Sequence, residues 1–154
     1  MAKPKTHKII YEKIKDLIPN KNNARTHSDE QIEQIAESIK EFGFINPVLT
    51  DGNKGVIAGH GRILGAERLG MTEVPTLPFN HLTKDQKRAY IIADNKLAEN
   101  AGWDKELLKL ELADLQVADF DLSLIGFGQD EINELLSSVE PLELDDDLPD
   151  LNNL

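Results

Sequence analysis

The chain has 154 residues, of which 40% are apolar, so it is long enough for one folded domain with a core and appended segments. It has no cysteine, which excludes disulfides, cysteine-ligated zinc and a thiol nucleophile, and no apolar run reaches the roughly 18 residues of a membrane span. The net charge of −11 is uneven, because residues 1–100 carry 15 basic and 13 acidic side chains whereas residues 101–154 carry 2 and 15. The start of the chain lacks the apolar stretch of a secretory signal, and we expect a cytoplasmic protein.

The first predicted elements are a strand and a long helix. A strand is expected at Lys8–Tyr11, and the asparagine-rich stretch after Pro19 predicts a loop. Ser28, with Gln31 three residues later, is typical of a helix N-cap, and Gly43 is typical of the position beyond a helix end. The apolar stripe between them has helical spacing and consists of Ile32, Ile35, Ala36, Ile39 and Phe42.

A hairpin and a glycine-rich turn come next. The sequence around Asp51-Gly52 predicts a strand hairpin whose first strand is Val48–Thr50. The second strand leads through Gly59-His60-Gly61-Arg62 into a helix that we expect to begin near Arg62 or Ile63.

The remaining elements are a strand and helices. Residues 74–79 predict a strand near the edge of a sheet, because Pro75 and Pro78 have no amide hydrogen for a strand ladder. A capping box at Thr83–Gln86 opens a helix, and further helices are expected within residues 104–139.

These elements predict an α+β fold with a helical annex. Residues 1–100 would form the domain, and residues 101–139 a leucine-rich, acidic annex that ends near Val139. Residues 140–154 carry six acids, two prolines and no base, which is the composition of a disordered acidic linker or tail.

The turn at residues 59–62 has the features of an anion site. Glycines let the backbone approach a ligand, and the start of a helix directs free N–H groups and a partial positive charge to the same point. His60 and Arg62 would add donors, and a guanidinium matches phosphate oxygens two at a time. The alternative is an ordinary turn with an exposed histidine and a surface arginine, which is the simpler interpretation of so short a motif by itself.

Four motifs follow one another in order over residues 9–100. They are Pro19-Asn20 with Arg25; Ser38-Ile39 with Gly43 and Pro47; residues 56–62 followed by Ala66, Leu69-Gly70 and Val74-Pro75; and Asp94-Asn95. This order resembles the N-terminal domain of the ParB and sulfiredoxin-like superfamily, also known as the ParB-like nuclease domain. The resemblance implies a short mixed sheet with packed helices and a nucleotide site, for CTP in chromosome-partition members and for ATP in others.

The resemblance also implies roles for particular residues. Arg25 would reach the phosphates from the first loop, and Asp94 and Asn95 would help to hold Mg²⁺, which prefers hard oxygen ligands. The phosphate-binding turn would consist of Gly59, His60, Gly61 and Arg62. The alternatives are that Arg25 is a solvated loop residue and that Asp94-Asn95 is a helix cap.

The chain also departs from its apparent relatives. Leu64 and Ala98 stand where partition proteins commonly have basic residues, so we expect a weaker hold on phosphate. The absence of cysteine excludes the thiol chemistry of sulfiredoxins. The helix-turn-helix and dimerisation domains of partition proteins are expected to be missing, and the acidic annex predicts that DNA is bound weakly or indirectly.

The annex has a resemblance of its own. Residues 93–136 resemble a segment that, in phage and bacterial proteins, follows a ParB-like domain and precedes an acidic linker and a DNA methyltransferase domain. No methyltransferase motif lies within the 154 residues, so the implied partner is a methyltransferase domain or another DNA-modification protein. Homodimerisation through the leucines of the annex is an alternative to their packing within it; these are Leu107, Leu108, Leu110, Leu112 and Leu115.

Three functions remain open at this point. The preferred one is a nucleotide-phosphate-binding regulatory module associated with DNA modification. The second is an enzyme, either a nuclease or a nucleotide hydrolase or phosphotransferase, for which Glu67, Asp94 and His60 are available although no catalytic residue is assigned. The third is a structural docking module whose turn binds nothing.

Overall fold

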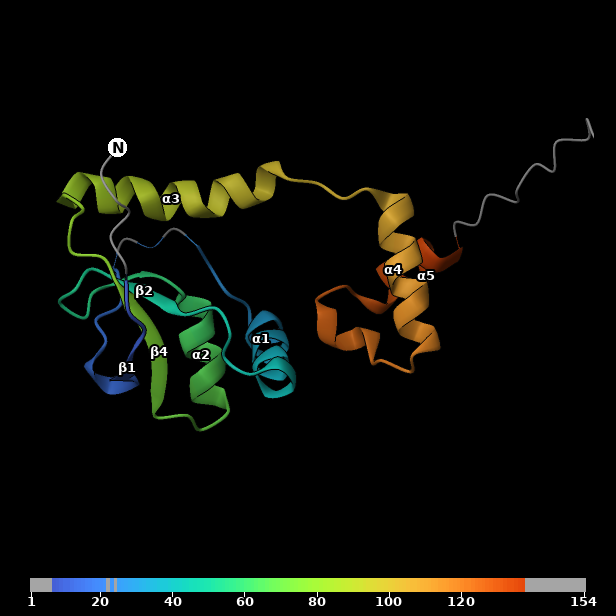
Figure 1. Cartoon of the computed structure of the whole chain (residues 1–154), viewed down its shortest axis with the longest axis horizontal. Helices are drawn as coiled ribbons and strands as arrows, with labels where there is room; N and C mark the ends of the chain where they lie inside the picture. Colours follow the sequence, from blue (N-terminus) through green and yellow to red (C-terminus); the bar gives the residue numbers. More distant parts are fainter. Residues whose placement is uncertain (1–6, 22, 24, 138–154) are drawn as a thin grey trace, which may run out of the picture. The chain divides into compact units, whose positions relative to one another are not determined.

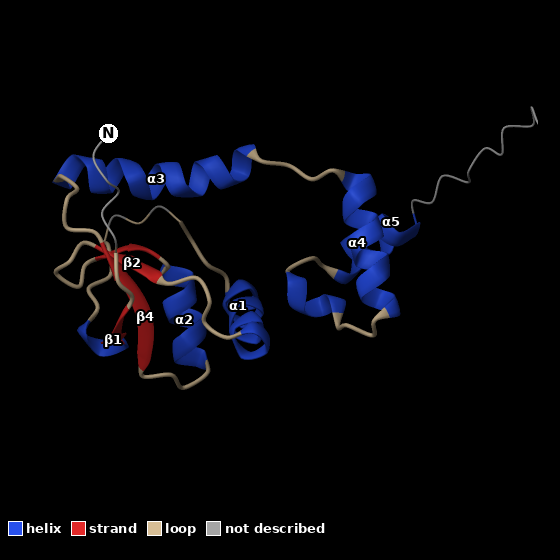
Figure 2. Ribbon diagram, in the orientation of Figure 1, coloured by secondary structure: helices blue, strands red, loops and turns tan. Residues whose placement is uncertain are grey.

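The computed structural model describes residues 7–21, 23 and 25–137 and divides them into two compact units. The first unit contains a four-stranded mixed sheet and three α-helices (Figures 1 and 2). It takes in the described residues up to Gly102 and, in addition, Leu124–Gly126. Its elements are β1 (Ile10–Lys13), the 3₁₀ helix η1 (Ile14–Asp16), α1 (Asp29–Phe42), β2 (Val48–Thr50), β3 (Val56–Ala58), α2 (His60–Arg68), β4 (Glu73–Pro78) and α3 (Lys84–Asn100). This architecture confirms the predicted α+β fold and the order of its elements.

Local capping patterns in the sequence correctly predict two helices. The Ser28 hydroxyl accepts a hydrogen bond from the Gln31 amide at 3.1 Å, and Gly43, with a φ of 85°, follows α1. At the start of α3, the Thr83 and Gln86 side chains each accept a hydrogen bond from the other residue's amide, which confirms the predicted capping box.

Two predicted starts differ from the structure. β1 begins at Ile10, two residues after the predicted Lys8. α2 begins at His60 and not near Arg62, because Gly59 adopts the left-handed conformation, with a φ of 109° and a ψ of 17°, and turns the chain from β3 directly into the helix. The residues at positions 60–62 therefore form the first turn of α2.

The prediction that residues 74–79 form an edge strand is wrong. The strand order is β1-β4-β2-β3, so β4 lies between an antiparallel partner, β1, and a parallel partner, β2. The register explains how β4 tolerates two prolines. Pro75 pairs with β1 before the β2 ladder begins at Thr76, and Pro78 pairs with β2 beyond the end of the β1 ladder. Each proline therefore lies where β4 pairs with one neighbouring strand only. The missing amide hydrogen of the proline then costs the sheet little stability.

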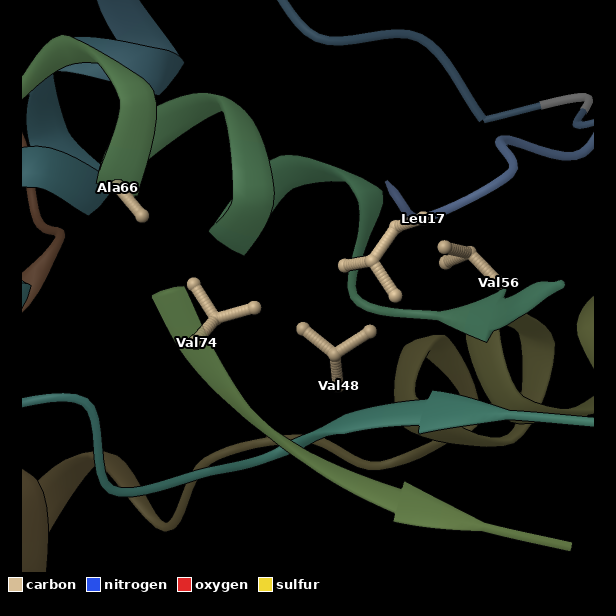
Figure 3. Packing of buried hydrophobic residues seen from close by; sticks show 5 residues of the cluster. All are labelled: Leu17, Val48, Val56, Ala66 and Val74. Atoms are coloured by element: carbon tan, nitrogen blue, oxygen red, sulfur yellow. The ribbon is translucent and has the colours of Figure 1, made fainter. Parts of the chain in front are cut away.

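The core of the first unit lies between α2 and the sheet. Figure 3 shows its buried side chains pointing toward one another; they are Leu17, Val48, Val56, Ala66 and Val74. α1 packs against α2 through two buried glycines, Gly61 and Gly65. A Cβ atom at Gly65 would lie 2.8 Å from Ile35 Cγ2, so these glycines set how closely the two helices approach.

The second unit is helical. Its α-helices are α4 (Lys105–Val117) and α5 (Gln129–Ser137). The 3₁₀ helix η2 (Leu122–Ile125) lies between them in the chain and is divided between the two units. Leu112 of α4 and Ile132 of α5 are buried, and the rings of Trp103 and Phe127 are in tilted contact, with centroids 5.4 Å apart and an angle of 55° between the ring planes. The predicted tail at residues 140–154 and the predicted end near Val139 lie outside the described residues. In the described part of the chain, every helix is too short or too polar to cross a membrane.

Candidate functional site

A cavity of about 130 Å³ lies at the N-terminus of α2. It is bounded by the loop before α1, the turn between β3 and α2, and the middle of α3, which crosses this end of the first unit (Figure 1). Its lining includes all seven residues that the sequence analysis assigned to a nucleotide or magnesium site: Arg25, Gly59, His60, Gly61, Arg62, Asp94 and Asn95. The fold therefore brings together residues that are up to 70 positions apart in the chain.

The first turn of α2 supplies backbone donors to this cavity. The first intrahelical hydrogen bond runs from the Ile63 amide to the Gly59 carbonyl at 3.0 Å, so the amides of residues 60–62 precede any helical acceptor. Gly59 has no side chain that could cap them. These amides and the positive end of the helix dipole favour an anion at this point.

Arg62 is partly buried, and the backbone of the loop before β2 binds its guanidinium. Its Nη2 donates to the Pro47 carbonyl at 3.0 Å, and its Nε is buried with no hydrogen-bond partner among the described residues. Burial lowers the pKa of Arg62, and the negative charge of Asp94 opposes that effect. A partly buried guanidinium whose Nε has no partner, beside a cavity, suits an anionic ligand that compensates its desolvation.

His60 connects two parts of the site. Its Nε2 accepts a hydrogen bond from the Asn20 amide at 3.1 Å, so this nitrogen is not the donor that the sequence analysis expected. Burial lowers the pKa of His60, and the nearby His27 lowers it further, so the ring is neutral near pH 7. Its role in the structure is to tie the loop after Pro19 to the start of α2.

Acidification should weaken the hydrogen bond between the Asn20 amide and His60, because a protonated Nε2 cannot accept it. The pKa of folded His60 lies below its usual value of 6.5, so below about pH 6.5 the unfolded chain takes up a proton that the folded chain does not. The free energy of unfolding should therefore fall as the pH drops from 6.5 toward the lowered pKa of His60. Above pH 6.5 the neutral His60 makes its full contribution to the free energy of unfolding. Urea denaturation between pH 7.5 and 5 should show a smaller loss of stability in His60→Gln than in the wild type. Identical pH dependence in the two proteins would contradict this role.

Arg25 is exposed and already has a partner. Its Nη1 lies 3.0 Å from Oε1 of Glu99, near the end of α3, and the two side chains are 44% and 52% exposed. Exposed ion pairs of this kind contribute about 0–1 kcal/mol, less than a charge-assisted contact with phosphate. A phosphate in the cavity could therefore displace Glu99 from Arg25.

Asp94 and Asn95 present oxygen atoms from α3. Asn95 Nδ2 donates to the Ile91 carbonyl at 2.8 Å, which leaves the amide oxygen as the potential metal ligand. The Tyr90 hydroxyl lies 3.5 Å from Asp94 Oδ1, and burial, followed by the charge of Asp94, raises the pKa of Tyr90. Among the described residues, no group of three or more histidine, aspartate or glutamate side chains could hold a metal ion. Two protein oxygens suit a Mg²⁺ ion whose other ligands are phosphate and water.

A second cavity, of about 360 Å³, adjoins the first. Both are lined by Asn23, Arg25, His27 and His60, and the walls of the second also include apolar side chains of η1, β3 and α2. Glu67, which the sequence analysis considered for acid–base chemistry, lines the second cavity but not the first. Asn23 and His27 also line the first cavity but are not among the residues predicted from the sequence. The available signal for them was that they lie close to Arg25 in the chain.

Family models match most of the chain. The ParB N-terminal domain matches residues 2–100, and the ParB-methyltransferase HTH domain matches residues 106–153. The prediction that the helix-turn-helix domain is missing is therefore wrong. The annex is acidic and leucine-rich, but a helix-turn-helix fold depends on the pattern of apolar residues rather than on net charge.

Individual relatives agree with this match. The chain is 51% identical over 81 residues to the ParB-like nuclease domain-containing protein YnaK of Escherichia coli (strain K12). This alignment covers 53% of this chain and 93% of YnaK. It is 26% identical over 118 residues to a nucleoid occlusion protein of Geobacillus kaustophilus (strain HTA426), covering 73% of this chain and 42% of that protein.

Solved structures share the fold. The C-terminally truncated chromosome-partitioning protein ParB from Caulobacter crescentus, in complex with CTP-γ-S, superposes with a TM-score of 0.68 at 21% identity, over 83% of this chain and 76% of that chain. The fold, the relative from Escherichia coli and the match over residues 2–100 agree, and the chain belongs to the family of the ParB N-terminal domain.

Proposed function

We propose that the chain is a nucleotide-binding regulatory module that serves DNA modification, and that it binds CTP or ATP together with Mg²⁺. The observation that carries this proposal is the convergence of the helix start, two arginines and two oxygen ligands on one small cavity. The unpaired Nε of Arg62 in the wall of this cavity supports an anionic ligand.

The phosphates would lie against the first turn of α2. The free amides of residues 60–62 would donate to the phosphate oxygens, and Arg62 would contribute charge from the wall of the cavity. Arg25 would exchange Glu99 for a phosphate oxygen. This exchange links the ligand to the end of α3, which gives a regulatory module a means of signalling occupancy.

Magnesium would join the phosphates to α3. Asp94 and the amide oxygen of Asn95 would supply two ligands, and the ion would neutralise the repulsion between the carboxylate and the triphosphate. The base and sugar would extend into the second cavity, whose apolar walls suit the less charged part of a nucleotide.

The role in DNA modification is supported by the match to a ParB-methyltransferase HTH domain.

Calorimetry with the full chain tests the proposal. CTP or ATP should bind in the presence of Mg²⁺, and chelation of the metal should weaken binding at least tenfold, because Asp94 would then repel the phosphates. The nucleoside monophosphate should bind more weakly than the triphosphate. Binding without phosphate release is the expected result.

The same samples separate the other two functions. Steady release of phosphate, or cleavage of added DNA, would replace the regulatory module with an enzyme. Absence of binding to CTP and ATP at millimolar concentration would leave a docking module.

A further inference from the structure

α4 carries apolar residues on two opposite faces. Leu108, Leu112 and Leu115 form the row that faces the core of the second unit, where Leu112 is 1% exposed. At about 100° per residue, Leu110 and Val117 fall on the other side of the helix, with Leu107 beside them. The exposed fractions of Leu107, Leu110 and Val117 are 61%, 61% and 88%, so the core of the unit does not use this row.

Trp103 lies just before α4, whose N-cap residue is Asp104. Its ring is in tilted contact with that of Phe127 of the same unit, and the residue is nevertheless 68% exposed. We call Trp103, Leu107, Leu110 and Val117 the exposed α4 face. Leu107, Leu110 and Val117 are three and seven residues apart on α4, which is the spacing by which one helix recognises another.

Acidic side chains surround this face. Asp114 lies within the row, and Glu106 and Glu111 flank it on its two sides. None of these three acids takes part in an ion pair among the described residues. Lys105 and Lys109 fall outside this sector of the helix. Unpaired acids around an apolar row are complementary to a partner with the opposite charge pattern.

We infer that the exposed α4 face docks a basic amphipathic helix of a partner protein. The apolar row of that helix would cover the row of α4, and its flanking lysines or arginines would pair with Glu106, Glu111 and Asp114. A second copy of α4 would bring like charges together, and residues 140–154 carry six acids and no base. Phosphate groups of DNA would be repelled by the same acids. This surface lies outside the nucleotide site and does not depend on it.

Trp103 makes the inference directly testable, because it is the only tryptophan of the chain. The probe is a synthetic 18-residue amphipathic helix of leucine and lysine, added to the full chain at physiological salt while Trp103 fluorescence is recorded. We expect a saturable shift of the emission to shorter wavelength. A peptide of the same leucine spacing with glutamate in place of lysine should produce none.

Variants locate the binding surface. Leu107→Ser and Leu110→Ser should each weaken binding of the lysine peptide at least tenfold, with unchanged circular dichroism, because both side chains are exposed. Ile92→Ser and Leu97→Ser are matched controls on α3, where the side chains are 65% and 68% exposed, and should bind as the wild type does.

Four outcomes would overturn the inference. The first is equal binding of the glutamate peptide, and the second is wild-type affinity in Leu107→Ser and Leu110→Ser. The third is a dimer in sedimentation that Leu110→Ser dissociates, since a second copy would then cover the face. The fourth is a Trp103 emission that is already at short wavelength and does not respond to peptide, which would show that the chain covers the face itself.

Discussion

Arg62→Ala is expected to lower the affinity for CTP or ATP by about ten- to a hundredfold. The substitution removes a charge-assisted contact worth roughly 1.5–3 kcal/mol. Arg62→Lys should recover only part of the loss, because an ammonium group keeps the charge but lacks the planar fork of the guanidinium. Calorimetric titration of the magnesium nucleotide into each variant measures the effect.

Arg68→Ala is the matched control for this experiment. Arg68 lies on the same helix, but its guanidinium pairs with Asp29 and Glu33 on the surface of α1 rather than lining the cavity. Its replacement should leave nucleotide affinity unchanged. The hydrogen bond from Arg62 to the Pro47 carbonyl implies that Arg62→Ala also reduces stability, so titrations belong well below its melting temperature. Equal affinities of Arg62→Ala and the wild type would remove the nucleotide site and leave an ordinary turn.

Gly65→Val and Gly61→Val are expected to destabilise the first unit without any ligand present. A Cβ at Gly65 would lie 2.8 Å from Ile35 Cγ2 and 3.2 Å from the backbone nitrogen of Ala36, which cannot move without shifting α1. A Cβ at Gly61 would lie 2.8 Å from Cε1 of His27, a ring that can swing aside. Overpacking costs about 1–3 kcal/mol, and the larger loss is expected for Gly65→Val.

Thermal denaturation measures this effect, since about 1 kcal/mol shifts the melting temperature of a domain of this size by roughly 4–8 °C. Gly102→Val is the control, because a Cβ there meets no atom within 4 Å and the backbone φ is not positive. Melting temperatures of Gly61→Val and Gly65→Val equal to that of the control would show that α1 and α2 are not in close contact. Gly61 also lines the cavity whereas Gly65 does not, so nucleotide binding by folded Gly61→Val should be the more impaired.

The sequence alone predicts the features that depend on neighbouring residues. The N-caps at Ser28 and Thr83 involve side chains and amides three residues apart, so short patterns identify the starts of α1 and α3. The hairpin around Asp51-Gly52 is equally local. The seven candidate site residues also follow from the sequence, because they lie in three of the four motifs by which the chain resembles the ParB N-terminal domain.

Only the tertiary structure decides the features that join distant segments. The central place of β4 follows from its pairing with β1 and β2, and the conformation of Gly59 moves the start of α2 to His60. His60 accepts a hydrogen bond from Asn20, 40 positions away, and Arg25 pairs with Glu99, 74 positions away. Neither of these partners could be derived from a local sequence pattern. Propensities and caps act over one helical turn, whereas the burial, charge and hydrogen-bond partners of a site depend on which elements the fold packs together.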